Sequence, residues 1–148
     1  RLFYSETNFG DITDYWCLDF SSTGRYDVIY NHILTHKYYL NQNKDNEISM
    51  EEAIKSWFYN VYFPLVSIIR EKYILRSFPN RTLGDLYVWT VRYWDDLKQK
   101  FGGDIPMDQA VKDFEKQYRI PLHKRILNRI KCIILRKAIY NANADSPN

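Results

Sequence analysis

Cysteine, glycine and proline are scarce in this chain. Of its 148 residues, two are cysteines, five are glycines and five are prolines. Cys17 and Cys132 lie far apart and neither belongs to a Cys-x-x-Cys pair, which excludes a disulfide framework and a zinc knuckle. We therefore expect reduced thiols and a cytoplasmic location. Few glycines and prolines also mean few sharp turns, which favours long helices over a many-stranded sandwich.

Long apolar runs and the common catalytic motifs are missing as well. No stretch approaches the roughly 20 apolar residues of a membrane-spanning helix, and no signal-peptide pattern opens the chain. The first residue is arginine, so we expect the sequence to be a piece of a longer protein. There is no glycine-rich phosphate loop and no Gly-x-Ser-x-Gly motif. These absences favour a non-enzymatic protein and leave an enzyme open as the alternative.

Aromatic residues are abundant. The chain holds thirteen tyrosines, eight phenylalanines and four tryptophans, and 45% of its residues are hydrophobic. Such a composition supports a sizeable core in a single domain and argues against disorder.

Positive charge is concentrated at the C-terminal end. Residues 119–148 have a net charge of +6 although the whole chain is only +3, so residues 1–118 are net −3. A basic helix expected over 121–140 could contact nucleic acid or a protein partner, or could lie against the acidic body of its own protein. The contact candidates are Lys124, Arg125, Arg129, Lys131, Arg136 and Lys137.

Helix signals dominate the rest of the chain. Thr23 is placed as the N-cap of one long helix, and Ser49 with Glu52 and Thr82 with Asp85 form the capping pairs of two others. Pro64 interrupts the helix that follows Ser49. We predict an all-α fold of about six helices, over 2–7, 24–43, 53–63 with a kinked continuation to 75, 82–101, 107–118 and 121–140.

The chain repeats itself with a shift of 57 residues. The shift superposes identical residues such as Tyr30 on Tyr87 and Pro64 on Pro121. We therefore expect two tandem, pseudo-symmetric helical units. An N-terminal helix and irregular lead-in cover residues 1–22, the units cover 23–78 and 79–140, and a polar tail covers 141–148.

Two histidines, His32 and His36, lie four residues apart on the predicted helix 24–43. This spacing puts both imidazoles on one face, where they could hold half of a metal site or line a polar ligand pocket with Arg25 and Asp27. No spacing predicts further metal ligands, so we predict no metal and no other cofactor. Under the repeat the two positions become Trp89 and Tyr93, which favours packed, hydrogen-bonded histidines.

Several strings in residues 1–135 resemble a bacterial family. The most specific are Gly24-Arg25-Tyr26-Asp27 with the two histidines, Trp57 to Pro64, and Phe78-Pro79-x-Arg81-Thr82 with Asp85-Leu86-Tyr87-x-Trp89. They are similar to the C-terminal region of proteins that carry an N-terminal ParB-like (ParB/sulfiredoxin-fold) domain and are often labelled transcriptional regulators. The resemblance implies a helical module beside an upstream domain that binds nucleotide or DNA. It carries no catalytic residue onto this chain.

Two functions follow from the sequence. The first is a non-enzymatic regulatory or interaction module of a cytosolic ParB-like protein, with the ParB-like domain as its partner. The alternative is a ligand- or metal-binding pocket, in a sensor or an enzyme, centred on Arg25, Asp27, His32 and His36. Nothing in the sequence indicates an oligomeric state.

Overall fold

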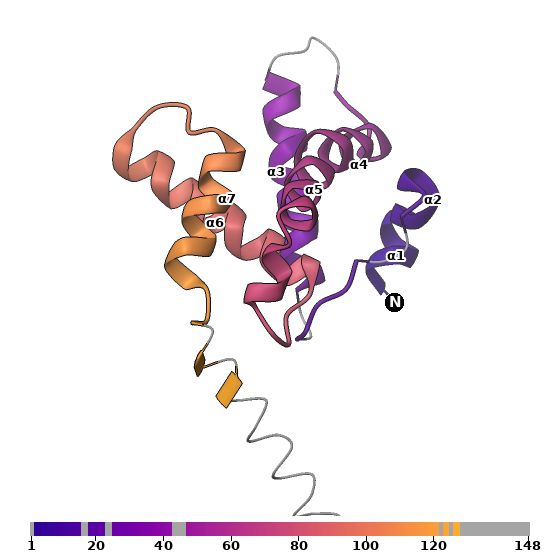
Figure 1. Ribbon diagram of the computed structural model, residues 1–148. Coiled ribbons are helices and arrows are strands. Elements are labelled where there is room, and N and C mark those ends of the chain that lie inside the picture. The colour runs from indigo at the N-terminus through magenta and orange to yellow at the C-terminus, as the bar shows by residue number, and fades with distance from the viewer. Residues whose placement is uncertain are drawn as a thin grey trace, which may run out of the picture.

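The computed structural model describes residues 2–15, 18–22, 25–42, 47–121, 123–124 and 126–127. Every regular element within these ranges is helical, which confirms the predicted all-α class (Figure 1). None of the helices in the described ranges has both the length and the apolar character needed to cross a bilayer. The elements are α1 (Leu2–Thr7), α2 (Phe9–Thr13), α3 (Tyr26–Gln42), α4 (Met50–Trp57), a π-helical segment (Phe58–Tyr62), α5 (Phe63–Glu71), a 3-10 turn (Ile74–Ser77), α6 (Leu83–Phe101) and α7 (Met107–Tyr118).

The short helix α2 replaces part of the irregular stretch expected after residue 7, so that expectation was wrong there. Asn8 and Asp14 flank α2 with left-handed backbone angles, φ 50° and 55°, which short polar side chains tolerate. The Thr13 hydroxyl donates to the Phe9 carbonyl at 2.7 Å. Phe9 is completely buried and packs edge-on against Trp57, so burial of one ring stabilises a helix too short to persist alone.

The helices α4 and α5 run on from one another through the π-helical segment. The capping box predicted before α4 is present, with Glu52 N donating to Ser49 Oγ at 3.2 Å and Ser49 N donating to Glu52 Oε2 at 3.0 Å. Pro64 lies in the first turn of α5 and has no N–H to donate to the carbonyl of residue 60. The wider π turn lies at the point where this bond is missing, which accounts for the predicted interruption.

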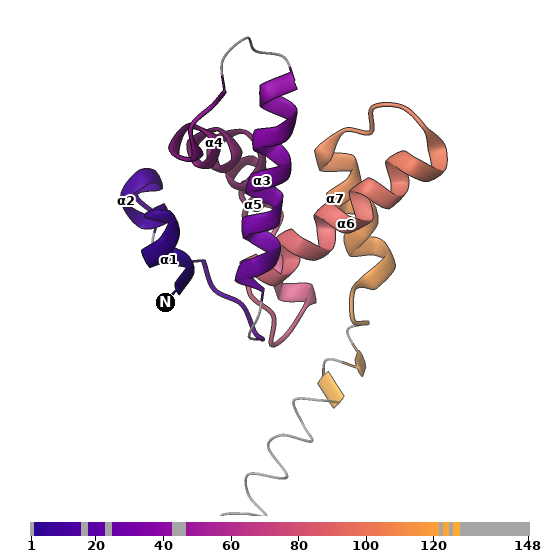
Figure 2. The same ribbon diagram turned by 180° about the vertical axis from the view of Figure 1, so that it is seen from behind.

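The central helices α3, α4 and α5 separate two helical pairs. The pair α1–α2 contacts α3 and α4 on one side, and α6–α7 packs against α5 on the other (Figures 1 and 2). Trp57, Tyr62 and Tyr87 are fully buried and lie ring against ring at the centre, with centroids 4.9–5.7 Å apart. These large rings join the α6–α7 pair to the central helices.

The helix starts agree with the 57-residue repeat. Tyr26 begins α3 and Leu83 begins α6, while Met50 begins α4 and Met107 begins α7. Within each unit the long helix packs against the helix that follows it. Pseudo-symmetry between the units stays a prediction. Thr23, the expected N-cap of α3, lies outside the described residues, as does most of the helix expected over 121–140.

The segment 18–22 is held against the first turn of α6. The Asp85 carboxylate, only 3% exposed, accepts from the backbone N–H of Ser21 at 3.2 and 3.3 Å and from that of Thr82 at 3.1 Å. The Thr82 hydroxyl donates to the Asp19 carbonyl at 2.7 Å. Burial acts to raise the pKa of the Asp85 carboxyl, but its hydrogen bonds with Ser21 and Thr82 outweigh burial and hold that pKa below its ordinary value.

Candidate ligand pocket between α6 and α7

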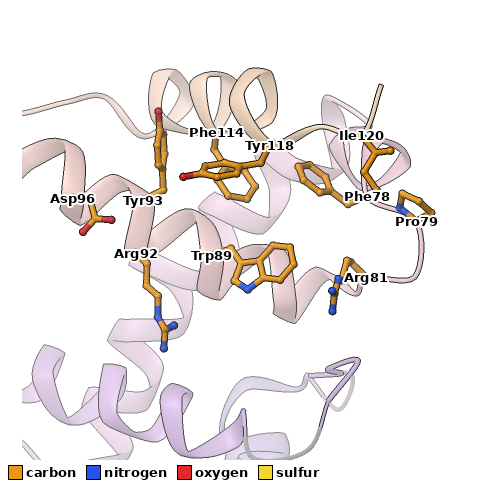
Figure 3. Close-up of a pocket in the computed structure, with 10 residues that line it drawn as sticks. All are labelled: Phe78, Pro79, Arg81, Trp89, Arg92, Tyr93, Asp96, Phe114, Tyr118 and Ile120. Atoms are coloured by element: carbon orange, nitrogen blue, oxygen red, sulfur yellow. The ribbon is translucent and has the colours of Figure 1, made fainter. Parts of the chain in front are cut away.

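A pocket of about 530 Å³ opens between α6, α7 and the loop that precedes α6 (Figure 3). Pro79, Arg81, Arg92, Asp96 and Ile120 contribute to its lining. The rest of the lining is aromatic and consists of Phe78, Trp89, Tyr93, Phe114 and Tyr118.

Helical spacing brings these side chains together. Trp89, Tyr93 and Asp96 follow one another at four and three residues along α6, and Phe114 and Tyr118 are four apart on α7. The two helices pack side by side, so the two stripes meet.

The aromatic rings of the pocket pack against one another. Phe78 stacks on Phe114 with centroids 5.5 Å apart, Tyr118 lies 5.2 Å from Phe114, and Tyr93 meets Tyr118 edge-on at 5.7 Å. Phe78 and Phe114 are buried, whereas half of Tyr118 is exposed. The pocket therefore has a buried aromatic floor and a partly open aromatic wall, on which a flat apolar group can stack.

Trp89 lies between two arginines in Figure 3. The Arg81 guanidinium covers the Trp89 ring, 4.8 Å from its centroid, and donates to Ser21 Oγ at 3.1 Å. Arg92 is exposed and forms no hydrogen bond or ion pair with any residue in the described ranges. Asp96 is exposed and equally without such a partner there.

The Tyr93 hydroxyl of the pocket is a poor nucleophile. Tyr93 donates to Gln117 Oε1 at 3.0 Å, and burial, with Asp113 and Tyr118 nearby, raises the pKa of its hydroxyl. Among the described residues, no histidine or cysteine lines the cavity. Within the described part of the chain the pocket can therefore stack, exclude water and pair with charge, but it offers no nucleophile beside a base.

His32 lies at the contact between α3 and α6. Its Nδ1 is 3.2 Å from the Tyr87 hydroxyl, and the two rings meet edge-on with centroids 5.7 Å apart. Burial lowers the pKa of His32; Asp95 acts to raise it and Arg92 lowers it further. The imidazole is therefore neutral at pH 7 and forms a hydrogen bond with the Tyr87 hydroxyl.

His36 lies at the contact between α3 and α4. Its Nε2 is 2.9 Å from Ser56 Oγ, which also accepts from Asn60 Nδ2 at 3.2 Å. Burial lowers the pKa of His36, and the Nε2 atom of the neutral ring can accept a hydrogen bond from the Ser56 hydroxyl. The two histidines share a helix face but pair with different helices.

The other two residues predicted for a histidine pocket, Arg25 and Asp27, form no hydrogen bond or ion pair with the histidines among the described residues. Arg25 Nε is 3.5 Å from Ser22 Oγ, and Asp27 is exposed in the first turn of α3. Neither forms a hydrogen bond to a histidine in the described ranges. In those ranges no three histidine, cysteine or acidic side chains gather closely enough to hold a metal.

Of the predicted basic contact residues, only Lys124 is described, and it is exposed. Arg125, Arg129, Lys131, Arg136 and Lys137 lie outside the described residues. Binding of nucleic acid or a protein partner through them therefore stays a prediction.

In the sequence, Trp89 and Tyr93 are the repeat equivalents of the two histidines, but nothing there predicts that they line a pocket. Both line the cavity described above. The available signal was the string from Phe78 to Arg81 followed, at helical spacing, by Trp89 and Tyr93. The missing information was that α7 supplies the opposite wall.

Compared with protein-family models, with curated proteins and with solved structures, the chain has no significant match.

Proposed function

We propose that the chain is a non-enzymatic regulatory or interaction module and that the pocket between α6 and α7 is its ligand site. The sequence resemblance supports a regulatory setting, in which an upstream ParB-like domain of a cytosolic protein is the partner. Ligand binding at the pocket is then the event that the module reports to that domain.

The aromatic lining of the cavity carries this proposal. Its volume of about 530 Å³ falls in the range of small-molecule sites, roughly 300–1,000 Å³. Five aromatic side chains surround the space, and the three charged side chains of the lining, Arg81, Arg92 and Asp96, are exposed. A lining of this kind suits binding of a flat, largely apolar group better than chemistry on it.

N-phenyl-1-naphthylamine, an uncharged aromatic dye that fluoresces in apolar surroundings, tests the proposal. We expect saturable binding with one dye per chain. Trp89→Leu removes a ring of the lining, and loss of about 1–3 kcal/mol of stacking predicts an affinity at least about fivefold lower.

Trp94→Leu is the matched control. Trp94 lies on the same helix, also beneath a cation (Lys98 Nζ is 3.7 Å from its ring centroid), but it does not line the pocket. Its replacement should leave dye affinity within about twofold, in protein whose helical circular dichroism is unchanged. Absence of saturable binding, or equal losses in both variants, would contradict the proposed function.

A further inference from the structure

Arg81, Trp89 and Arg92 form a row along one side of the pocket, here called the arginine–tryptophan row. Figure 3 shows the indole between the two guanidinium groups, with the tyrosines and phenylalanines of the lining on the other side of α6. Arg81 already has partners within the protein, because its guanidinium covers the Trp89 indole and donates a hydrogen bond to Ser21. The five N–H donors of Arg92 form no hydrogen bond with any of the described residues.

The charge at the pocket edge favours one anionic group. Arg81 and Arg92 contribute two positive charges and Asp96 one negative charge. Asp96 follows Arg92 by four residues on α6 and therefore lies on the same helix face. An anion near Arg92 is attracted by two cations and repelled by one carboxylate, so the net charge of +1 at the pocket edge favours its binding.

We propose that the pocket selects a planar aromatic anion of small-molecule size. This inference rests on the proposed function. The ring of the ligand stacks against Trp89, and its carboxylate, sulfonate or phosphate accepts hydrogen bonds from Arg92, which lies three residues on along the same face of α6. A guanidinium is well suited to this role, since its fork of donors matches two oxygens of such a group.

The surroundings of the row favour a small anion over a nucleic acid strand. Asp95 and Asp96 lie on the same helix, and residues 1–118 have a net charge of −3. A polyanion would bring many negative charges to this acidic surface, whereas a compact ligand brings one anionic group, which Arg92 can pair with directly.

Two dyes with one skeleton test this selectivity. 1-Anilinonaphthalene-8-sulfonate is N-phenyl-1-naphthylamine with a sulfonate added, so the ratio of their affinities isolates the anionic group. We expect the sulfonate to bind at least about tenfold tighter at low salt, and the ratio to fall as salt increases.

Arg92→Gln should lower the affinity for the sulfonate about tenfold and leave that for the neutral dye within about twofold. Arg70→Gln, the matched control, changes the net charge equally at a smaller hollow of about 270 Å³ and should change neither affinity. Asp96→Asn should raise sulfonate affinity about twofold, because it removes a like charge. Unlabelled 1-naphthoate should displace the sulfonate dye, and a short thymidylate strand should not.

The outcomes separate this inference from the proposed function. If neither dye binds, the proposed function itself fails. If both bind equally well, or if Arg92→Gln weakens both alike, the pocket exists but does not select an anion. A loss of sulfonate binding in Arg70→Gln would place the anion at the smaller hollow, and displacement by thymidylate alone would replace the small ligand with a strand. Each of these results overturns the inference.

Discussion

Replacement of Gly84 by alanine sets a small gain in helix propensity against a larger steric conflict. Gly84 is buried in the first turn of α6, where alanine is favoured over glycine by at most about 1 kcal/mol. An added Cβ would lie 2.3 Å from the Asp19 carbonyl oxygen and 2.6 Å from Cε1 of Phe20. The Phe20 ring can turn aside, but the carbonyl belongs to the backbone. The segment 18–22 must therefore move by about 1 Å to reach an ordinary contact of roughly 3.3 Å.

Such a movement breaks the bonds that hold this segment. The Asp19 carbonyl accepts from the Thr82 hydroxyl at 2.7 Å, and Ser21 donates to the buried Asp85 carboxylate at 3.2 and 3.3 Å. A neutral hydrogen bond contributes about 1 kcal/mol and one to a charged group about 1.5–3 kcal/mol. After the gain in helix propensity is subtracted, we expect Gly84→Ala to lower the free energy of unfolding by about 2 kcal/mol.

Urea and thermal unfolding followed by circular dichroism measure this loss. For a chain of this size about 2 kcal/mol corresponds to a fall in Tm of roughly 4–8 °C. Phe20→Ala and the double variant complete a thermodynamic cycle, in which we expect a coupling below about 1 kcal/mol because the backbone carbonyl sets the conflict. A more stable Gly84→Ala protein would refute the close approach of the two segments. A coupling as large as the whole loss would assign the conflict to the Phe20 ring.

Three further predictions concern pH, the α6 cap and the C-terminal region. Burial lowers the pKa of His32 and His36, so the unfolded chain binds protons at a higher pH than the folded chain does. The urea midpoint should therefore fall as the pH decreases from 7.5 through 6.5 to 5.5, and it should fall less in His32→Gln. A pH-independent midpoint would contradict this. Asp85→Asn should lower the free energy of unfolding in urea by about 1–3 kcal/mol. Because the pKa of Asp85 is lowered in the folded chain, the stabilisation by its carboxylate should persist at pH 5 and be lost as the pH falls below 3.8. An equal effect of the substitution at pH 3 would contradict this. If the basic C-terminal region binds DNA, the affinity measured by fluorescence anisotropy should fall steeply with salt. Binding should be lost when Arg125, Arg129 and Lys131 are all replaced by alanine. Unchanged binding in this triple variant would exclude these contacts.

The parts of the fold that were predicted correctly depend on short-range chemistry. The capping boxes at Ser49 and Thr82 are complete within four residues, and each precedes a helix as predicted, although α4 begins at Met50, three residues before the expected start. The helix α6 ends at Phe101 as predicted, and Gly102 follows it with φ 64°, an angle that glycine adopts without strain. The helix α2 was missed because its stability comes from burial of Phe9 against a distant tryptophan, which no local pattern reveals.

The site could be predicted only in part because its residues come from three segments. The helical spacing of Trp89 and Tyr93 was visible in the sequence, but their exposure to a cavity depends on where α7 lies. The histidine pair shows the same limit from the other direction. Spacing placed His32 and His36 on one face, but α3 lies against α6 near one and against α4 near the other. Two residues on one helix face act as a pair only when a single neighbouring element faces both, and helical periodicity alone does not specify that element.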